Sequence, residues 1–377
     1  MNERPSSLRN DADTAFLLMC LCARSSMGAD AREQAEELIL AGIDWPRLMR
    51  LAYSHRVAGL LLANFRSESV TGVPAAVIAG LEKSEHLRKV RTVFLVAELT
   101  RLTSLLQGDG IQSMAFKGPV IARVAYGSDD LRGFSDLDIL IDPGKFPDTR
   151  KLLLANGYEP FSKLAGLSER GEKLFLWQSR QYQFKRANGM FNLDLHLEIM
   201  PPLYRFPLDF GSLYRERLEL KVGSGAVSTF SHTHMLLVLC FHCIKNRWEQ
   251  LKHVADIAEH VGRNQTSIDW DLLTQIAVKA RCRNIVHLSL RLATLLLDAP
   301  VPVHVSDALH SRRIDRLADQ AVREFRVGRN LTLTPFLTRL RENLVIQDTI
   351  AQKLRYIGGA LVRRAADLTA RSSLIQN

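Results

Sequence analysis

Residues 115–142 read AFKGPVIARVAYGSDDLRGFSDLDILID and place two aspartates inside an apolar run with the composition of a strand. An isolated carboxylate is costly to remove from water, so Asp136 and Asp138 either lie on the solvated face of an edge strand or hold a cation. Side chains alternate between the faces of a strand, so both aspartates share one face while Leu137 and Ile139 point into a core. The stretch therefore predicts a sheet strand with two carboxylates on one face.

A second strand with the same pattern is predicted at residues 191–199, FNLDLHLEI, where Asp194, His196 and Glu198 share a face. An Asn-Gly pair at residues 188–189 joins it to the run YQFKR and is the strongest short signal for a hairpin. Carboxylates brought together on neighbouring strands repel one another, and a divalent cation removes that conflict. Oxygen ligands of this kind suit Mg²⁺ or Mn²⁺. The predicted catalytic metal ligands are Asp136, Asp138 and Asp194.

A glycine turn precedes the first two aspartates. Gly118 stands between a short apolar run at residues 111–116 and the helix-like segment VIARVAY. A glycine there lets backbone N–H groups approach phosphate oxygens, and the N-terminus of the following helix adds a favourable dipole. Lys117 and Arg132 are candidate cations for the same phosphates. Carboxylates on neighbouring strands after such a turn are the layout used for two-metal phosphoryl transfer.

The regions on either side of this unit are predicted to be helical. Residues 13–107 carry apolar residues at spacings of three and four, with breaks at Gly and Pro signals. Helical patterns return after Pro202, beginning with residues 233–261, which form one long helix or a pair. The prediction is an α+β fold with a small mixed-sheet core flanked by helical regions. The expected units are residues 1–107, 108–202 and 203–377.

The first helical segment of the C-terminal region carries a polar stripe on an apolar background. Its members follow spacings of three and four and are His242, Lys245, Glu249, Lys252 and Asp256. The stripe either faces an active-site cleft, where Lys245 would bind the β- or γ-phosphate, or forms a solvated face. The neighbouring Trp248 and Leu251 are predicted to lie in the core.

Charge, cysteine content and the length of the apolar runs limit the classes of protein to which the chain can belong. The chain has 377 residues and a net charge of +10, and residues 311–371 hold 12 Arg and 1 Lys against 6 acidic residues. Such a region can attract a nucleotide, a nucleic acid or an anionic membrane, and we interpret it as the solvated faces of Arg-rich helices. The five cysteines form no disulfide framework, which favours a reducing cytoplasm. The longest apolar runs are about half of a membrane span, so no membrane association is expected.

The order of these signals resembles the nucleotidyltransferase superfamily typified by DNA polymerase beta. More narrowly, residues 115–142, then LDLHLEI, then LLVLCFHCIKNRWEQLKHVADIAEHV are similar to a largely uncharacterised bacterial nucleotidyltransferase-like family, over about residues 117–256. The resemblance implies that the α+β unit is a nucleotidyltransferase core. It also implies roles for four residues: a phosphate-side turn at Gly118 and metal ligands at Asp136, Asp138 and Asp194.

The chain departs from the superfamily pattern at the turn. Pro119 follows Gly118, where the superfamily has Gly-Gly or Gly-Ser, and it supplies neither an N–H group nor a hydroxyl. The interval from Gly118 to Asp136 is also longer than is usual in the superfamily. Ser135 is a candidate for the missing hydroxyl.

The sequence and the resemblance together predict an Mg²⁺- or Mn²⁺-dependent nucleotidyltransferase. It would move a nucleoside monophosphate from an NTP such as ATP to an unidentified small-molecule or protein acceptor and release pyrophosphate. The alternative is a binding or regulatory module that keeps the fold but has lost catalysis at the Gly-Pro turn. An enzyme directed at nucleic acid ranks last, because no aromatic and basic module of a known type is present. The oligomeric state is left open.

Overall fold

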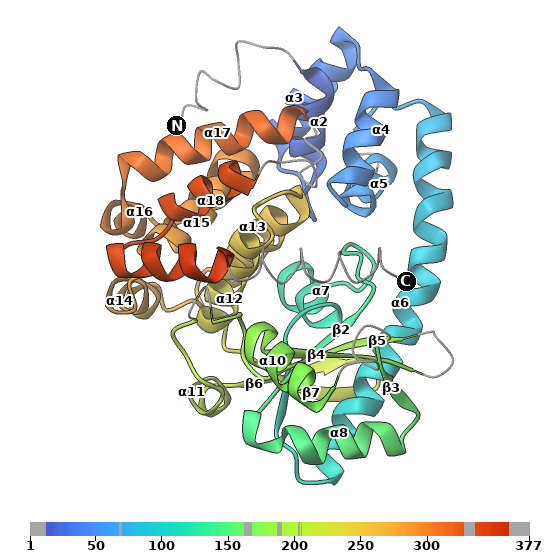
Figure 1. The fold of residues 1–377 in the computed structure, drawn as a ribbon. Helices are drawn as coiled ribbons and strands as arrows, with labels where there is room; N and C mark the ends of the chain where they lie inside the picture. The colour runs from blue at the N-terminus through green and yellow to red at the C-terminus, as the bar shows by residue number, and fades with distance from the viewer. Residues whose placement is uncertain are drawn as a thin grey trace, which may run out of the picture.

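The computed structural model describes residues 13–67, 70–161, 168–186, 191–202, 204, 206–327 and 336–361. Figure 1 shows N-terminal helices, a sheet with its own helices, and a C-terminal group of helices. The predicted α+β class is confirmed. The boundaries of the three units stay predictions.

The N-terminal region is helical, as the apolar spacing predicts. The breaks fall where the Gly and Pro signals lie: Gly42 ends one helix in a positive-φ conformation, and the extended Pro74 begins the longest one. That helix, α6, has 34 residues and runs from the N-terminal helices down to the sheet (Figure 1). The helices are α2 (Thr14–Cys22), α3 (Ala29–Ala41), α4 (Trp45–Ser54), α5 (Ala58–Arg66) and α6 (Ala75–Gly108).

The central sheet has five strands in the order β1-β2-β5-β4-β3. Only β2 and β5 run parallel, and the other neighbours are antiparallel, so the sheet is mixed as predicted. The strands are β1 (Ser113–Ala115), β2 (Leu137–Ile141), β3 (Tyr158–Pro160), β4 (Gln181–Arg186) and β5 (Asn192–His196). The helices of this unit are α7 (Pro119–Tyr126), α8 (Phe146–Ala155) and α10 (Glu169–Ser179), with the short η1 (Pro143–Lys145).

The position of β2 decides between the two interpretations of its aspartates. Every residue of β2 is buried, and the strand lies inside the sheet between β1 and β5. The edge-strand interpretation of Asp138 is therefore wrong. The predicted antiparallel pairing of β4 with β5 is confirmed, and the Asn-Gly turn at residues 187–190 lies outside the described residues.

The region after Pro202 is not wholly helical, which corrects the prediction. After α11 (Phe210–Arg215), the chain forms an antiparallel hairpin of β6 (Leu218–Val222) and β7 (Gly225–Thr229). Its two-residue turn begins at Gly223, which has φ of 58°. A Gly-Ser pair between two short runs, LELKV and GAVST, is thus an ordinary hairpin signal that the sequence analysis overlooked. The hairpin packs beside β1 and against α6, where Thr100 Oγ1 donates a 3.2 Å hydrogen bond to the carbonyl of Val222.

The remaining chain forms a helical group. Residues 350–361 are also helical, and the rest of the helix predicted to reach residue 370 lies outside the described residues. The helices are α12 (His232–Lys245), α13 (Leu251–Asn264), α14 (Trp270–Lys279), α15 (Arg283–Leu297), α16 (Val303–Leu309), α17 (Arg312–Val327) and α18 (Phe336–Val345).

The polar stripe of residues 242–256 is split between α12 and α13. The helix breaks after Lys245, where Arg247 and Trp248 adopt positive φ and their N–H groups bond the carbonyls of Ile244 and Cys243 at 2.8 Å. Trp248 is only 5% exposed and Leu251 is buried, as predicted. The burial of Trp248 stabilises a backbone conformation that is costly for a non-glycine residue.

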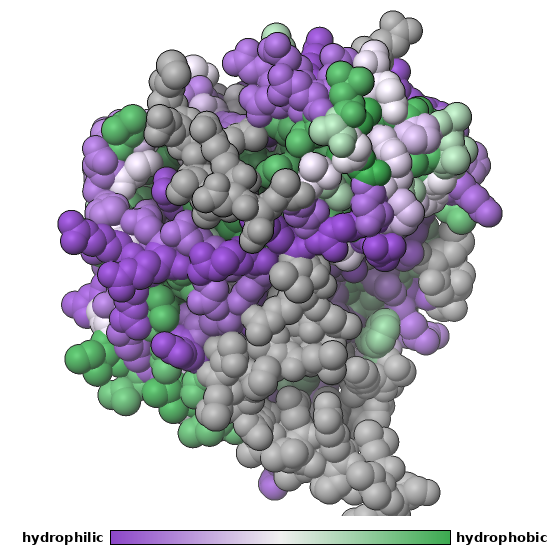
Figure 2. Space-filling model, turned by 90° about the horizontal axis from the view of Figure 1, so that it is seen from above, coloured by the Kyte–Doolittle hydropathy of each residue, from purple (hydrophilic) through white to green (hydrophobic). Residues whose placement is uncertain are grey.

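Within α17, the described residues of the Arg-rich C-terminal region fit the interpretation as a solvated helix face. In α17, Ile314, Ala318 and Ala321 are buried while Arg312 and Arg316 are exposed. Figure 2 shows a mainly hydrophilic face with apolar side chains in separate patches. All five cysteines are free and buried. Among the described residues, no helix has both the length and the apolar character that crossing a bilayer requires.

Candidate active site

A cleft of about 340 Å³ lies where the sheet, the N-terminal helices and the break between α12 and α13 meet. All eight residues that the sequence analysis proposed for the site line this cleft: Lys117, Gly118, Arg132, Ser135, Asp136, Asp138, Asp194 and Lys245. The structure thus brings together residues more than a hundred positions apart. Their chemical roles stay predictions.

Asp138 is the most constrained of the carboxylates. It is 4% exposed and lies opposite Asp194 in the register of the parallel pair β2 and β5. Lys117 Nζ donates to its Oδ1 at 2.7 Å, and His196 Nε2 lies 2.9 Å from the same oxygen. Burial alone would raise the pKa of Asp138, but the Lys117 ammonium and the His196 hydrogen bond outweigh it and hold that pKa well below its usual range.

Asp194 is in the opposite electrostatic situation. Burial, followed by the nearby charge of Asp138, raises the pKa of Asp194 to about 6, although the Gln183 amide donates to its Oδ1 at 3.0 Å. Asp136 is half-buried and adds a further negative charge one residue before β2. Three carboxylates therefore lie together in the cleft, and Lys117 contacts one of them, Asp138, directly.

The donor set fits a divalent cation. Asp138, Asp194 and His196 each offer one ligand atom within 4.8 Å of the others. Both hydrogen bonds to Asp138 fall on Oδ1, so Oδ2 keeps its lone pairs for a ligand. The sequence analysis placed His196 on the face of Asp194 without giving it a role. Its ring is buried, packs edge-on against Phe116 at 4.9 Å and has its pKa lowered to about 4 by burial. A neutral His196 therefore donates from Nε2 and orients Asp138.

The predicted glycine turn is present and tightly packed. Gly118 has φ of 51°, and a Cβ on it would lie 3.1 Å from the carbonyl oxygen of Asp136. Pro119 takes the first position of α7, and the N–H of Val120 donates to the carbonyl of Lys117 at 3.0 Å. The start of α7 therefore has fewer free backbone donors for phosphate than the superfamily pattern implies.

Gly118→Ala is expected to lower the free energy of unfolding by about 1–2 kcal/mol and to lower activity further, because the new Cβ pushes the Asp136 backbone away. Chemical denaturation and a nucleotide-transfer assay measure the two effects. Gly262→Ala is the control, since open space surrounds that glycine within α13. Equal effects of the two substitutions would contradict the role given to the turn.

Arg132 lines the cleft, but its guanidinium forms an ion pair with Asp256. It is buried, and its Nε and Nη2 donate to the two oxygens of Asp256 at 2.7 and 2.8 Å. Tyr126 Oη donates to Asp256 Oδ1 at 3.0 Å, and Arg132 Nη1 donates to the carbonyl of Gly118 at 3.4 Å. This network fastens the glycine turn and α7 to α13. The predicted role of Arg132 as a phosphate cation is untested.

Three basic residues of the helical regions also line the cleft, and we call them its basic side. Lys245 ends α12, Lys252 is the second residue of α13, and Arg56 follows α4. Burial, followed by the charge of Arg132, lowers the pKa of Lys252 to about 7. His242 and His253 pack at 5.1 Å between ring centroids, and burial lowers the pKa of both, so both rings are neutral at pH 7. The cleft therefore has an acidic side and a basic side.

Arg56 is a cleft residue that sequence reasoning missed. The adjacent His55 is buried; its Nδ1 accepts from the N–H of Leu251, and its carbonyl accepts from that of Lys252, both at 3.2 Å. These contacts place Arg56 in the cleft. The sequence carries no local signal for them, because the partners are almost 200 residues apart. Glu198, predicted on the same strand face as Asp194, is instead exposed and pairs with Arg180 at 3.5 Å.

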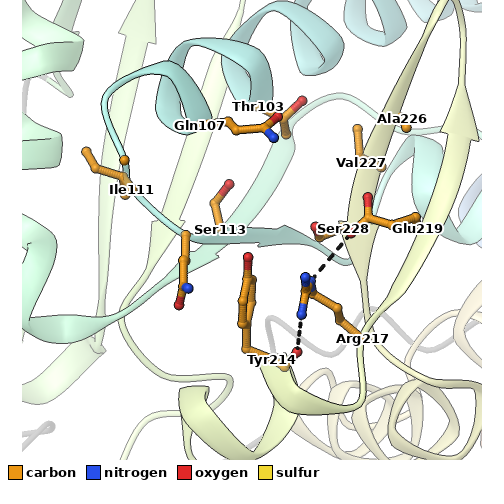
Figure 3. A pocket seen from close by; sticks show the side chains of 12 residues that line it. Thr103, Gln107, Ile111, Ser113, Tyr214, Arg217, Glu219, Ala226, Val227 and Ser228 are labelled. Atoms are coloured by element: carbon orange, nitrogen blue, oxygen red, sulfur yellow. Dashed lines mark hydrogen bonds and ion pairs between the residues drawn. The ribbon is translucent and has the colours of Figure 1, made fainter.

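A second cavity, of about 260 Å³, lies between the end of α6, β1 and the β6–β7 hairpin. Figure 3 shows Tyr214 and Arg217 side by side in it, with the guanidinium 4.0 Å from the ring centroid. Arg217 donates to the Tyr214 carbonyl at 3.0 Å and pairs with Glu219 at 3.5 Å. None of the predicted site residues lines this cavity.

Comparison with known proteins agrees with the geometry of the cleft. Residues 41–298 match the model of a family described as an uncharacterised nucleotidyltransferase, and this segment includes all eight predicted site residues. No curated protein is significantly similar to the chain in sequence. Since the match covers more than half of the chain, the protein belongs to this nucleotidyltransferase family.

Proposed function

We propose that the protein is an Mg²⁺- or Mn²⁺-dependent nucleotidyltransferase that moves a nucleoside monophosphate from an NTP to an acceptor. The observation that carries the proposal is the pairing of Asp138 with Asp194 across β2 and β5, inside a cleft that also holds Asp136. A carboxylate whose pKa is raised by burial and by a neighbouring carboxylate, as that of Asp194 is, is common in functional sites.

The metal would be held by Asp138 and Asp194, with Asp136 beside them. When bound, it supplies charge neutralisation at the transferring phosphate and activates the attacking oxygen. His196 holds the Asp138 carboxylate in place from behind. Lys117 contacts Asp138, and its ammonium would balance the negative charge of a phosphate bound beside it.

The triphosphate would be held mainly by side-chain cations of the basic side. Pro119 offers no N–H, and that of Val120 is used within the turn, so backbone donors contribute less than in the superfamily pattern. Lys245, Lys252 and Arg56 line the same cleft and would contact the phosphate oxygens. In the transfer, the acceptor oxygen bonds to the α-phosphorus while the bond from that phosphorus to the bridging oxygen breaks, and pyrophosphate leaves.

The acceptor is an unidentified small molecule or protein with a hydroxyl, phosphate or similar group. The test is to incubate the protein with each α-labelled NTP, Mg²⁺ and a cell extract, and to identify what becomes labelled. Transfer of label that needs both the protein and a divalent metal supports the proposal. Absence of labelling with every NTP, in both Mg²⁺ and Mn²⁺, counts against it.

A binding module without catalysis is the second candidate. It is favoured by the Lys117–Asp138 ion pair, which neutralises the key carboxylate without any metal. Calorimetric titration separates the two functions. NTP binding that strengthens with Mg²⁺ fits the enzyme, whereas no NTP binding, together with binding to another ligand, fits the module.

Asp194→Asn is expected to stabilise the protein above pH 6 while weakening metal binding. The folded-state pKa of about 6 exceeds the ordinary 3.8, so the carboxylate costs stability progressively as pH rises through this window. Removing it should add about 1–2 kcal/mol at pH 8, after allowance for its partial exposure. The asparagine oxygen still accepts from Gln183.

Urea unfolding at pH 5 and pH 8, with and without Mn²⁺, measures both effects of Asp194→Asn. Wild type should gain stability from Mn²⁺ at pH 8, and the variant should gain less. Glu198→Gln, which removes an exposed carboxylate two residues after His196, is the control. A variant less stable than wild type at pH 8 would rule out the repulsion described for the cleft.

A further inference from the structure

A second group of metal-ligand side chains lies away from the cleft, among the C-terminal helices. His287 is in α15, His310 follows α16, and Asp315 is in the first turn of α17. Each offers one ligand atom within 4.8 Å of the others. Figure 1 shows α15, α16 and α17 grouped apart from the strands of the sheet. The proposed nucleotidyl transfer uses none of these residues.

The distances from the two histidines to Asp315 are longer than those of good hydrogen bonds. His287 Nε2 lies 3.4 Å from Asp315 Oδ1, and His310 Nδ1 lies 3.4 Å from Asp315 Oδ2. Good N–H···O hydrogen bonds are shorter, about 2.7–3.2 Å. Two ligands on a tetrahedral ion with bonds of about 2.0–2.1 Å are about 3.3–3.4 Å apart. Both separations are therefore long for hydrogen bonds, and each has the length of one tetrahedral edge, although they end on different oxygens of Asp315.

The buried ring of His287 lacks the hydrogen bonds that its burial calls for. It is 5% exposed, its Nδ1 has no hydrogen-bond partner, and its Nε2 forms only the 3.4 Å contact with Asp315 among the described residues. Buried polar groups are normally hydrogen-bonded, and the exceptions call for a missing partner. An ion bound at Nε2 would replace the long contact with Asp315 by a bond, while Nδ1 would carry the proton of the neutral ring and stay without a partner.

The charges around the group permit a cation. Burial lowers the pKa of His287, so its ring is neutral at pH 7 and able to coordinate. Arg291 is the competing charge, with Nε 3.6 Å from Asp315 Oδ1, but its side chain is 40% exposed and can turn into solvent. Arg283 adds a more distant positive charge. Asp315 supplies the negative charge at the centre of the group.

We propose that His287, His310 and Asp315 form a Zn²⁺ site that joins α15, α16 and α17. Two imidazole nitrogens and one carboxylate are a donor set for zinc, whereas the carboxylate-rich cleft suits Mg²⁺ or Mn²⁺. The three protein ligands leave a fourth position for water. Because the ligands come from three separate helices, the ion would tie together the ends of α15, α16 and α17.

The test is zinc binding to the full-length, chelator-treated protein, measured by competition with a chromophoric chelator. His310→Gln removes an exposed ligand, and His304→Gln is the matched control, because His304 is an exposed histidine of α16 outside the group. His310→Gln should weaken zinc binding by about 100-fold, at or above the loss seen when only an outer partner of a ligand is removed. Zinc should raise Tm in wild type and in His304→Gln, and much less in His310→Gln.

Zinc bound in the cleft must be separated from this site. The same measurements in Asp138→Asn, which lacks one cleft ligand, should again show zinc binding that His310→Gln removes. Equal zinc affinity of Asp138→Asn and of the double variant Asp138→Asn with His310→Gln would overturn the proposal. A wild-type protein that binds no zinc would also overturn it. Failure of the nucleotide-transfer assay leaves the proposal unaffected, because the readout is binding and thermal stability.

Discussion

Asp138→Asn is expected to reduce nucleotide transfer by at least about 1,000-fold, the scale of losing a central electrostatic group of an active site. The substitution removes the charge that faces Asp194 across the two parallel strands and leaves the side-chain shape nearly unchanged. One amide oxygen replaces the carboxylate, so the metal loses a charged ligand, and Lys117 loses its ionic partner. Transfer of α-labelled nucleotide from each NTP, with Mg²⁺ or Mn²⁺, measures the loss.

Two comparisons make the Asp138→Asn result specific. Circular dichroism and the denaturation midpoint should show a folded protein, since the asparagine side chain still accepts the His196 hydrogen bond. Glu198→Gln removes a carboxylate outside the cleft and should keep nearly full turnover. Full turnover of Asp138→Asn would contradict the assignment of the metal ligands, whatever the substitution of other residues shows.

The largest stability effect is expected from Arg132→Met. This substitution leaves Asp256 charged, buried at 1% exposure and without its two bonds from the guanidinium. Breaking one side of such a buried pair costs about 3–5 kcal/mol. Urea or guanidinium denaturation measures the cost. The exposed Lys145–Asp148 pair, 3.9 Å apart, is the control, and Lys145→Met should cost at most about 1 kcal/mol.

The double variant Arg132→Met with Asp256→Leu separates the cost of an unpaired buried charge from the cost of losing the Arg132–Asp256 contact. It should recover much of the lost stability, because no isolated charge then remains in the core. The hydroxyl of Tyr126 loses its acceptor in the double variant, so recovery should be incomplete. If Arg132→Met alone cost less than about 1 kcal/mol, the buried pair would be no stronger than a surface one.

The acidic side of the cleft could be predicted from the sequence because its signals are local. Period-two alternation placed Asp136 and Asp138 on one face, and the Asn-Gly signal paired the strand of Asp194 with residues 182–186. The parallel pairing of that strand with β2 has no such local signal. The glycine turn was visible in the same way, since only a glycine readily takes the positive φ of Gly118.

The basic side needed contacts that no local pattern encodes. Helix periodicity continued through residues 246–250, where the burial of Trp248 breaks the helix. Arg132 was a candidate phosphate cation because it is basic and precedes the two aspartates, but its partner Asp256 lies 124 positions later. Arg56 reached the cleft through the neighbouring His55 and its bonds to α13. Long-range packing, which sets all three positions, is decided by the whole fold.

The contact of His55 with the start of α13 joins the N-terminal and C-terminal regions at the cleft, so a fragment that lacks either region also lacks part of the cleft. A fragment limited to residues 108–202 would keep Asp136, Asp138 and Asp194 but would lack the cations of both flanking regions. It could attract a metal without retaining the triphosphate. All residues that line the cleft lie within the matched segment, residues 41–298, so we expect that a fragment capable of the proposed transfer must include parts of all three regions.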